Sequence, residues 1–234
     1  MSTPQPTISI IIPVLNEEKY IKDVLFSISA NARTKCIKEI LVIDGGSTDQ
    51  TITNAEAYGA TVLKSKKGRA AQMNFGATNA NGEILYFLHV DTLPPEGFDK
   101  EIIQEFKKGF EVGCFQMRFN SNSRFLKFFS WCTRINHHIC RGGDQSLFIT
   151  RKLFHLLDGF NESYIVYEDN EFIQRVYKLK PFKVISSAVT TSARRYEERG
   201  MIRLQYHFGI IHLKHRLGAN PKDLYQYYLK HIAA

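Results

Sequence analysis

The sequence predicts an α/β fold in which a mainly parallel sheet is covered by helices on both faces. In the first half of the chain, short apolar segments rich in β-branched residues alternate with segments of helical periodicity. Continuous apolar character is typical of strands that are buried on both faces. A repeated strand–helix–strand order favours parallel neighbours joined by crossover helices.

The first strand is expected at residues 7–15, where Pro13 ends a β-branched segment and Asn16 is placed to cap the following helix. Ser47 and Gln50 have the spacing of a capping box, which predicts a helix from there to about Tyr58. The order of expected elements is strand 7–15, helix, strand 38–44, helix 47–58, strand 60–65, helix 68–82, strand 83–91, helix 95–108 and strand 112–119.

The pattern is less regular after residue 120. It predicts an aromatic helix at 123–139, a strand at 144–149, a helix with an acidic first turn at 168–179, and an amphipathic basic segment at 201–217. The aromatic and basic segments favour either a site near a membrane surface or a dimer interface, and both interpretations stay open.

The chain of 234 residues suits one domain spanning residues 1–234. Its net charge of +8 lies in the last quarter, since residues 176–234 hold 11 Lys/Arg and 3 Asp/Glu. This excess indicates an anionic partner or a solvated basic face. Four cysteines without a CxxC pair, no apolar segment long enough for a transmembrane helix, and no signal-peptide pattern predict a cytoplasmic protein, with peripheral contact at the inner face of the membrane as a further expectation.

Polar residues follow three of the predicted strands: Pro13 to Glu17, Asp44 to Ser47, and His89 to Asp91. Ligands of such sheets bind beyond the carboxyl ends of the strands, so these residues are expected to converge on one site. The phosphate-binding patterns GxGxxG and GxxxxGK[ST] are absent from the sequence.

The segments "IIPVLNEE", "VIDGGSTDQT" and "FLHVDT", in this order, resemble the inverting family-2 glycosyltransferases over about residues 7–175. The similarity is greatest to a compact bacterial subgroup with HxD in place of DxD. It implies a GT-A-type αβα sandwich with a mainly parallel, Rossmann-like nucleotide-binding sheet and a helical, basic C-terminal extension. It also implies a donor half at about 7–119, an acceptor and catalytic half at about 120–200, and amphipathic helices at about 201–234.

The resemblance implies a nucleotide-sugar donor, with a UDP-sugar as the first choice. Asp44 matches the family's nucleoside-binding aspartate, although an Asp before Gly-Gly is also a common turn former. Pro13, Asn16 and Glu17 would shape the loop around the base. Arg69 begins a helix in a "GRAAQMNFG" context, where a guanidinium and a helix N-terminus suit a diphosphate.

His89 and Asp91 are the candidate metal-binding residues. Strand alternation would place both side chains on the same side, with Val90 turned away. One carboxylate together with phosphates and waters suffices for Mg²⁺, and an imidazole favours Mn²⁺. Asp91 is therefore the expected ligand of Mn²⁺ or Mg²⁺. His89 is either a ligand or a histidine that lines the site.

Glu168 and Asp169 match the family's "ED" pair, in which a carboxylate takes the proton of the acceptor hydroxyl. Asp169 is the expected base and Glu168 its support, although an acidic helix start explains both charges as well. Asp144 and Gln145 are candidates for bonding the acceptor's hydroxyls. Arg194 and Arg195 stand where processive members of the family have QxxRW, but this sequence lacks the glutamine and the tryptophan, and two surface arginines in a basic region are the alternative. Arg194 and Arg195 are candidates for holding the leaving diphosphate.

Two alternatives to a metal-dependent inverting transferase stay open at this point. The first is an inactive nucleotide-sugar or glycan-binding protein of the same fold, since the first aspartate of DxD is missing. The second is a nucleotidyltransferase, which usually has a glycine-rich basic loop that "PVLNEEKYI" does not supply. No nucleic-acid partner is expected, because no recognisable RRM, KH or helix-turn-helix pattern accompanies the basic excess.

Overall fold

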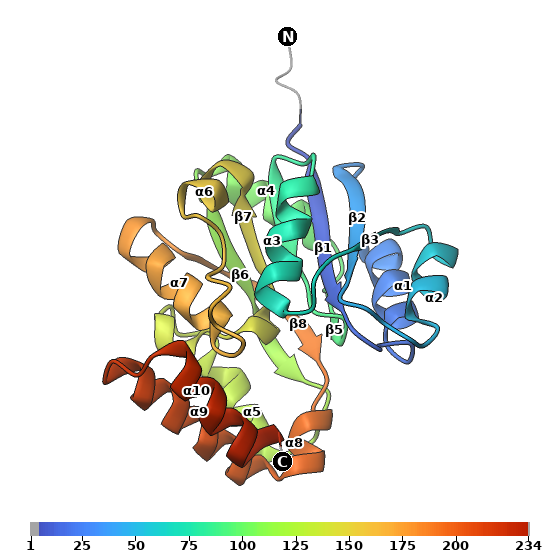
Figure 1. The fold of residues 1–234 in the computed structure, drawn as a ribbon. Coiled ribbons are helices and arrows are strands. Elements are labelled where there is room, and N and C mark those ends of the chain that lie inside the picture. Colours follow the sequence, from blue (N-terminus) through green and yellow to red (C-terminus); the bar gives the residue numbers. More distant parts are fainter. Residues whose placement is uncertain (1–4, 234) are drawn as a thin grey trace.

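A computed structural model describes residues 5–233 of the chain. It contains an eight-stranded sheet in the order β3-β2-β1-β4-β7-β6-β8-β5, with helices on both faces (Figure 1). The fold class expected from the sequence is confirmed.

The N-terminal half of the sheet is parallel. β1 (Ile8–Val14) lies between β2 (Ile37–Asp44) and β4 (Ile84–Phe87), and β3 (Thr61–Lys64) forms the edge beyond β2. The strands are connected by α1 (Ile21–Asn31), α2 (Thr51–Ala57) and α3 (Arg69–Asn79). Each β-branched strand is followed by a crossover helix, as the predicted β-α-β order requires.

The C-terminal half is mixed. β7 (Leu147–Thr150) is antiparallel to both β4 and β6 (Val112–Phe119), and β8 (Lys183–Thr191) is parallel to β6 and antiparallel to the short β5 (Thr92–Leu93). The helices of this half are α4 (Phe98–Lys107), α5 (Arg124–Cys132), α6 (Arg151–Leu156) and α7 (Glu168–Leu179). Two short 3-10 helices, η1 (His138–Cys140) and η2 (Gly143–Gln145), precede β7.

The core has two layers because the strands alternate their side chains between the two faces of the sheet. On one face Ile10 and Tyr86 pack with residues of α1 and α4, among them Ile28 and Phe98. On the other face Ile11 packs with residues of α3, α6 and α7. The sheet is therefore buried on both sides, which explains its continuously apolar strands.

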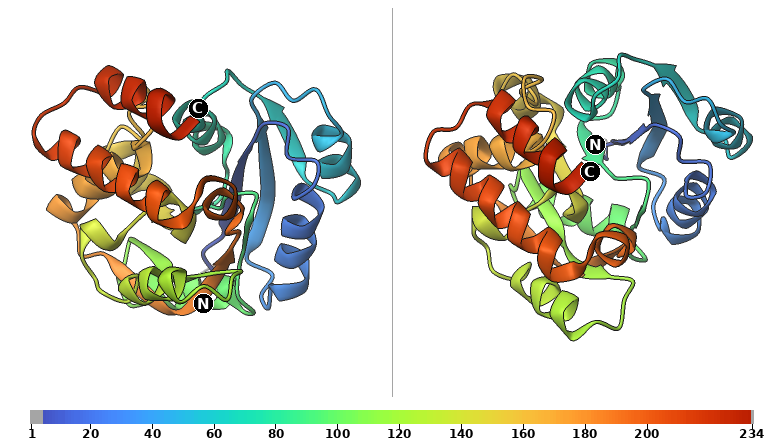
Figure 2. Two further views of the ribbon diagram at one scale, coloured as in Figure 1. Left: turned by 90° about the horizontal axis from the view of Figure 1, so that it is seen from below. Right: turned by 60° about the horizontal axis from the view of Figure 1, so that its bottom comes forward.

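The C-terminal helices α8 (Arg194–Arg199), α9 (Met201–Arg216), α10 (Pro221–Tyr228) and η3 (Leu229–Ala233) form a separate layer. They pack on one another around Leu204, Ile211 and Leu224. Figure 2 (left), seen from below, shows this layer beside the blue N-terminal strands and in front of the C-terminal half of the chain. Among the described residues, no helix is long and apolar enough to cross a membrane.

Several expected boundaries were wrong. α1 begins at Ile21 without Asn16 as its cap, and α2 begins at Thr51 without a capping box, because the Ser47 hydroxyl accepts a hydrogen bond from the Asn16 backbone instead. β4 ends at Phe87 rather than residue 91, since the chain turns at His89 and the Thr92 amide bonds back to the His89 carbonyl.

Two later boundaries also differ. The aromatic helix ends at Cys132 rather than residue 139, and β7 begins at Leu147 because η2 occupies the start of the expected strand.

Candidate functional site

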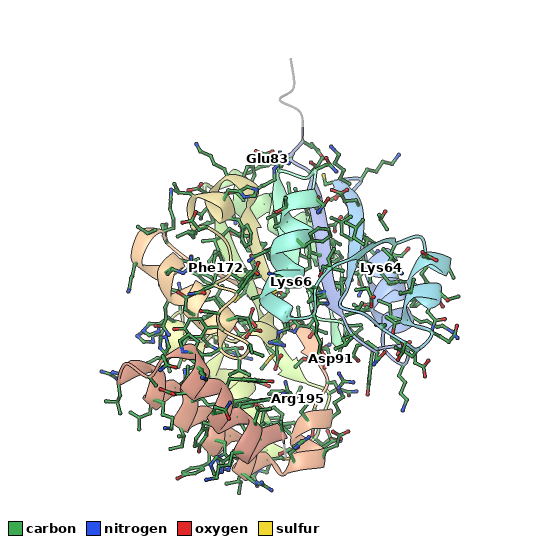
Figure 3. All side chains as sticks on the ribbon, in the orientation of Figure 1. Lys64, Lys66, Glu83, Asp91, Phe172 and Arg195 are labelled. Atoms are coloured by element: carbon green, nitrogen blue, oxygen red, sulfur yellow. The ribbon has the colours of Figure 1, made fainter. Side chains whose placement is uncertain are left out.

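Most of the residues singled out in the sequence meet in one polar cavity of about 400 Å³ at the carboxyl ends of the parallel strands. Figure 3 labels Asp91 at this edge of the sheet and, below it, Arg195 of α8. The predicted residues that line the cavity are Pro13, Glu17, Arg69, His89, Asp91, Asp144, Arg194 and Arg195. They come from both halves of the chain, so the cavity exists only in the folded protein.

Arg194 joins two of the three predicted strand ends. Its two terminal nitrogens lie 3.1–3.2 Å from the carboxylate oxygens of Glu17, and one of them lies 3.5 Å from Asp91 Oδ2. Its guanidinium also stacks over the Tyr20 ring at 4.2 Å from the centroid. The positive charge of Arg194 therefore balances the Glu17 and Asp91 carboxylates, which would otherwise repel one another across the cavity.

Arg69 joins the first turn of α3 to the first turn of α7. Its Nε donates to Glu168 Oε1 over 2.6 Å, and its Nη2 donates to Asp169 Oδ2 over 3.1 Å. The predicted donor-binding arginine and the predicted catalytic pair are therefore in direct contact. Burial alone would lower the pKa of Arg69, but the charges of Glu168 and Asp169 raise it.

Asp169 is a buried carboxyl with a strongly shifted pKa. Burial and the neighbouring Glu168 carboxylate raise its pKa to about 7, although Arg69 acts in the opposite direction. A carboxyl with a pKa near neutrality can accept a proton efficiently at physiological pH. Both residues also form the acidic first turn of α7, as the alternative interpretation of the sequence expects.

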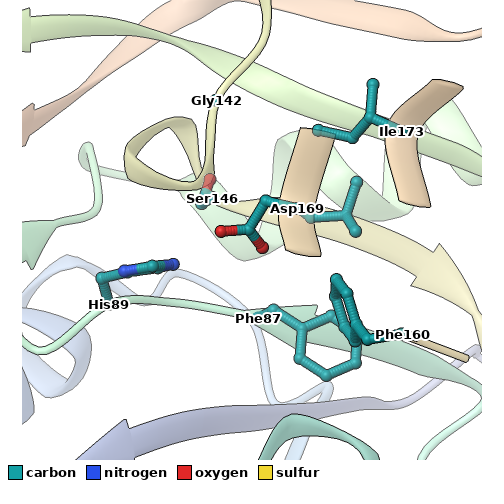
Figure 4. A pocket seen from close by; sticks show the side chains of 8 residues that line it. Phe87, His89, Gly142, Ser146, Phe160, Asp169 and Ile173 are labelled. Carbon is teal, nitrogen blue, oxygen red and sulfur yellow. The ribbon is translucent and has the colours of Figure 1, made fainter. Parts of the chain in front are cut away.

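His89 faces Asp169 across a small cavity of about 10 Å³, also lined by Phe87 and Ser146, which is about the room of one water molecule (Figure 4). Burial and the charges of Arg69 and Arg195 lower the pKa of His89 well below its usual range, so its imidazole is neutral. His89 Nδ1 lies 3.4 Å from Arg69 Nη1. The imidazole of His89 therefore lies close to Arg69 and also faces Asp169 across the small cavity.

Strand alternation was the wrong basis for pairing His89 with Asp91, because β4 ends before either residue. Both side chains nevertheless line the polar cavity, and so does Val90, which also packs in the core. No cluster of three or more His, Cys, Asp or Glu side chains suited to a metal ion occurs among residues 5–233.

Asp91 still fits a divalent cation that is also held by phosphate oxygens and water. Its carboxylate is largely buried, faces the cavity and has the long contact with Arg194. Burial raises the pKa of Asp91, Asp144 and Glu17 raise it further, and Arg194 opposes them. An added cation would relieve this excess of acidic charge, so the donor set suits Mn²⁺ or Mg²⁺ bound together with a diphosphate.

Asp44 and Asn16 lie beside this cavity's strands but bond to the chain itself. The Asp44 carboxylate is buried and accepts from the backbone amides of Gly46 and Ser47 at 3.0 Å. Asn16 adopts a positive φ of 54° and its side-chain oxygen accepts from the Thr48 amide at 2.8 Å. These bonds shape the first two loops, as the turn-forming interpretation of Asp44 expects.

Gln145 is likewise engaged within the chain. It donates to the Cys140 carbonyl at 2.9 Å and accepts from Arg141 Nη1 at 2.8 Å. Arg141, which the sequence analysis did not single out, is buried and also donates to the carbonyls of Thr133 and Ile135. It therefore fixes the loop before β7, where Asp144 enters the site.

A second cavity of about 660 Å³, hereafter the chamber, adjoins the polar cavity at Arg69, Asp144 and Arg195 and is also lined by Asp169. It is enclosed by α5, the segment before α7, and the C-terminal helices, and its lining includes Tyr167, Tyr196, Tyr228 and His212. None of these four residues was predicted from the sequence. The aromatic segment 123–139 and the amphipathic segment 201–217 were the features that pointed to their neighbourhood.

A model of the family described as "Glycosyl transferase family 2" matches residues 9–159. An uncharacterized glycosyltransferase of Rickettsia typhi is 35% identical over 105 residues, 43% of this chain and 32% of the relative. Glucosyl-3-phosphoglycerate synthase of Mycobacterium tuberculosis is 36% identical over 100 residues, 38% of this chain and 30% of that enzyme. The chain thus matches about a third of the length of these relatives.

Solved structures show the same fold at low sequence identity. S. aureus TarS 1–349 in complex with UDP-GlcNAc has a TM-score of 0.67 at 23% identity, and the match covers 80% of this chain and 58% of that one. The M. tuberculosis glucosyl-3-phosphoglycerate synthase in complex with Mn²⁺, UDP and phosphoglyceric acid has a TM-score of 0.64 at 19% identity, covering 91% of this chain and 79% of that one.

Proposed function

Because the chain belongs to glycosyl transferase family 2, we propose that it transfers a sugar from a UDP-sugar to an acceptor hydroxyl with inversion, using Asp169 as the general base. The observation that carries the proposal is the position of Asp169. It lines the chamber on one side, contacts Arg69 of the polar cavity on the other, and has a pKa of about 7.

The polar cavity is the proposed donor site. Arg69, Arg194 and Arg195 bring positive charge into it, and a diphosphate is the donor group that would bind there. Asp44 would contact the nucleoside from the neighbouring loop, with Pro13, Asn16 and Glu17 shaping the space for the base. The UDP complexes of two proteins with this fold support the choice of donor.

In the proposed reaction the acceptor oxygen attacks the anomeric carbon from the face opposite the diphosphate, which inverts the configuration. Asp169 takes the proton from this oxygen as the new carbon–oxygen bond forms. The bond from the anomeric carbon to the diphosphate breaks, and its electron pair leaves on UDP. Arg194 and Arg195 would stabilise the charge that develops on the leaving group.

Asp91 would hold a divalent cation, Mn²⁺ or Mg²⁺, and neutral His89 is a second candidate ligand within the same cavity. When bound, such a cation would offset negative charge on the diphosphate. The Mn²⁺ and UDP in a structural relative support this choice of cofactor. The HxD pattern would then replace the family's DxD.

The acceptor would approach through the chamber, with Asp144 near its reacting end. A dolichyl-phosphate sugar transferase of Methanococcus voltae, 32% identical over 113 residues that make up 43% of this chain and 34% of the relative, supports an acceptor carried by a lipid. Peripheral contact with a membrane surface would follow from such an acceptor, and the basic C-terminal helices suit an anionic surface. A homodimer through the same face is the alternative use of these helices.

The test combines donor binding with turnover. Heat stability is measured with UDP and Mn²⁺, and transfer or donor hydrolysis is measured with a panel of nucleotide sugars. Asp169→Asn should keep the stabilisation by UDP and Mn²⁺ but lower turnover by about 10²–10⁴-fold. Glu197→Gln, at an exposed residue of α8, is the control and should keep turnover.

Unchanged turnover in Asp169→Asn would refute the base assignment. Nucleotide-sugar binding with no transfer to any acceptor and no hydrolysis would instead favour a binding protein of the same fold.

A further inference from the structure

The chamber and the proposed donor cavity share part of their lining. Both are lined by Arg69, Asp144, Arg195 and Tyr196, and Asp169 lines the chamber. Its volume of about 660 Å³ is in the range that encloses a drug-sized molecule. A molecule held here would present its end to the Asp169 carboxylate.

The walls of the chamber are mainly apolar, in contrast to the donor cavity. β6 and α5 contribute one side and the C-terminal helices the other, with the segment before α7 between them. The apolar side chains that form these walls include Phe119, Phe129, Ile139, Val166, Phe208 and Ile211. Contact with such walls favours a ligand that buries apolar surface.

Several polar groups on the walls bond to one another, whereas Asn170 Oδ1 and Arg141 Nε are buried without a hydrogen-bond partner among the described residues. The Tyr167 hydroxyl lies 2.9 Å from His212 Nδ1, and the Tyr196 hydroxyl donates to Gln205 over 3.2 Å. Arg195 donates to the Tyr228 hydroxyl over 2.9 Å. A ligand group placed against these three pairs would have to break their bonds, which is costly, so this part of the wall favours the apolar portion of a ligand.

The rim of the chamber is apolar as well. Ile139 and Ile165 line the chamber and are 59% and 56% exposed. Phe128 and Trp131, on the nearby α5, are also exposed. These exposed apolar side chains offer a surface for the apolar part of a ligand.

We infer that the chamber binds the acceptor as an amphiphilic alcohol, with its hydroxyl at Asp169 and its apolar body against the walls of α5 and α9. This assignment rests on the proposed function and adds the chemical class of the acceptor. The hydroxyl proton goes to Asp169, the acceptor oxygen bonds to the anomeric carbon, and UDP leaves with the electron pair of the broken bond.

The test uses two alkyl glucosides with the same head group. Octyl β-glucoside, below its micelle concentration, should bind at least about tenfold more tightly than methyl β-glucoside in titration calorimetry, because its chain buries apolar surface. Ile139→Asp and Ile165→Asp should each weaken octyl glucoside binding by about tenfold or more. Leu156→Asp, an equally exposed apolar position on α6 away from the chamber, should leave it unchanged.

Stabilisation by UDP and Mn²⁺ is measured on every variant to show that the fold and the donor cavity are intact. Equal binding of the two glucosides, or no effect of the rim substitutions, would overturn the inference. A dimer that the rim substitutions convert to a monomer, without chain-dependent glucoside binding, would overturn it in favour of a second copy of the chain. Chain-dependent binding without any sugar transfer would uphold the chamber's ligand class and refute the proposed function instead.

Discussion

Arg69 and Asp169 are joined by a hydrogen bond of 3.1 Å from Nη2 to Oδ2, across 100 positions of sequence. This contact connects the first turn of α3, on the donor side, with the first turn of α7, on the acceptor side. One guanidinium therefore serves two proposed tasks. It is placed to bind the donor's diphosphate, and it counteracts the rise in the pKa of the proposed base.

The pH dependence of transfer should follow the neighbours of Asp169. In the wild type, kcat/KM should fall as pH drops through about 7, since the base must be deprotonated. Arg69→Met should move this acidic limb to higher pH, because Arg69 lowers the pKa of Asp169. Glu168→Gln should move it to lower pH, because Glu168 raises that pKa. Full pH profiles of the two variants measure the shifts.

Arg69→Lys is the matched control, because it keeps the positive charge. The acidic limb of its kcat/KM profile should move less than that of Arg69→Met. Shifts of Arg69→Met and Glu168→Gln in the same direction would contradict the electrostatic account of this site.

The same carboxyl should make stability depend on pH. Folding raises the pKa of Asp169 from 3.8 to about 7, so its contribution to stability is fully present below about pH 4 and is lost as pH rises through about 7. Asp169→Asn removes this titration. The wild type should lose stability as pH rises from about 5 to about 8, and Asp169→Asn should not. The Tm of Asp169→Asn minus that of the wild type should therefore increase over this range, by about 2–4 °C for each kcal/mol of stability that the wild type loses.

Thermal unfolding in a series of buffers measures this difference, with Glu197→Gln as a carboxylate control that should follow the wild type. A difference that stays constant over this pH range would show that Asp169 does not titrate there.

Removal of the Asp91 carboxylate should uncouple nucleotide binding from the metal. With UDP and Mn²⁺ at about 100 times their dissociation constant, the wild type should gain about 2.7 kcal/mol of stability, and a chelator should abolish most of it. Asp91→Ala should lose the metal-dependent part, while Glu56→Gln, at an exposed residue of α2, should keep it. Equal stabilisation of Asp91→Ala and the wild type would exclude Asp91 as the ligand.

Two glycines in helices should respond oppositely to alanine. A Cβ at Gly76 in α3 would meet Ile11 Cγ2 at 2.5 Å and Ile43 Cγ1 at 3.0 Å, so Gly76→Ala should cost about 1–3 kcal/mol. A Cβ at Gly209 in α9 meets nothing within 4 Å, so Gly209→Ala should stabilise the protein by about 0.5–1 kcal/mol. Urea unfolding measures both, and similar effects would refute the close packing of α3 on the sheet.

Local sequence patterns were sufficient to predict strands and helices whose bounds depend on local periodicity. Continuous apolar strands such as Ile8–Val14 and the helical periodicity of Glu168–Leu179 predicted these elements at nearly their observed bounds. Boundaries that depend on tertiary contacts were wrong. The capping role expected of Ser47 failed because its hydroxyl bonds to the Asn16 backbone in another loop. The expected strand to residue 91 failed because the chain turns at His89.

The sequence likewise predicted only part of the candidate site. Carboxyl strand ends must meet at one edge of a parallel sheet, so the sequence could predict that Glu17, His89 and Asp91 converge. It could not predict the partner of each side chain. The contacts from Arg194 to Glu17 and from Arg69 to Asp169 join positions that are 177 and 100 residues apart.

The sequence by itself determined the α/β class, the family and the set of charged residues available at the strand ends, because these follow from local periodicity and short motifs. The tertiary structure decided how these charges are paired and how deeply they are buried. Burial beside Glu168 and Arg69 gives Asp169 its pKa of about 7. The packing of α5 and α9 encloses an apolar chamber next to it, and no short stretch of sequence encodes that space.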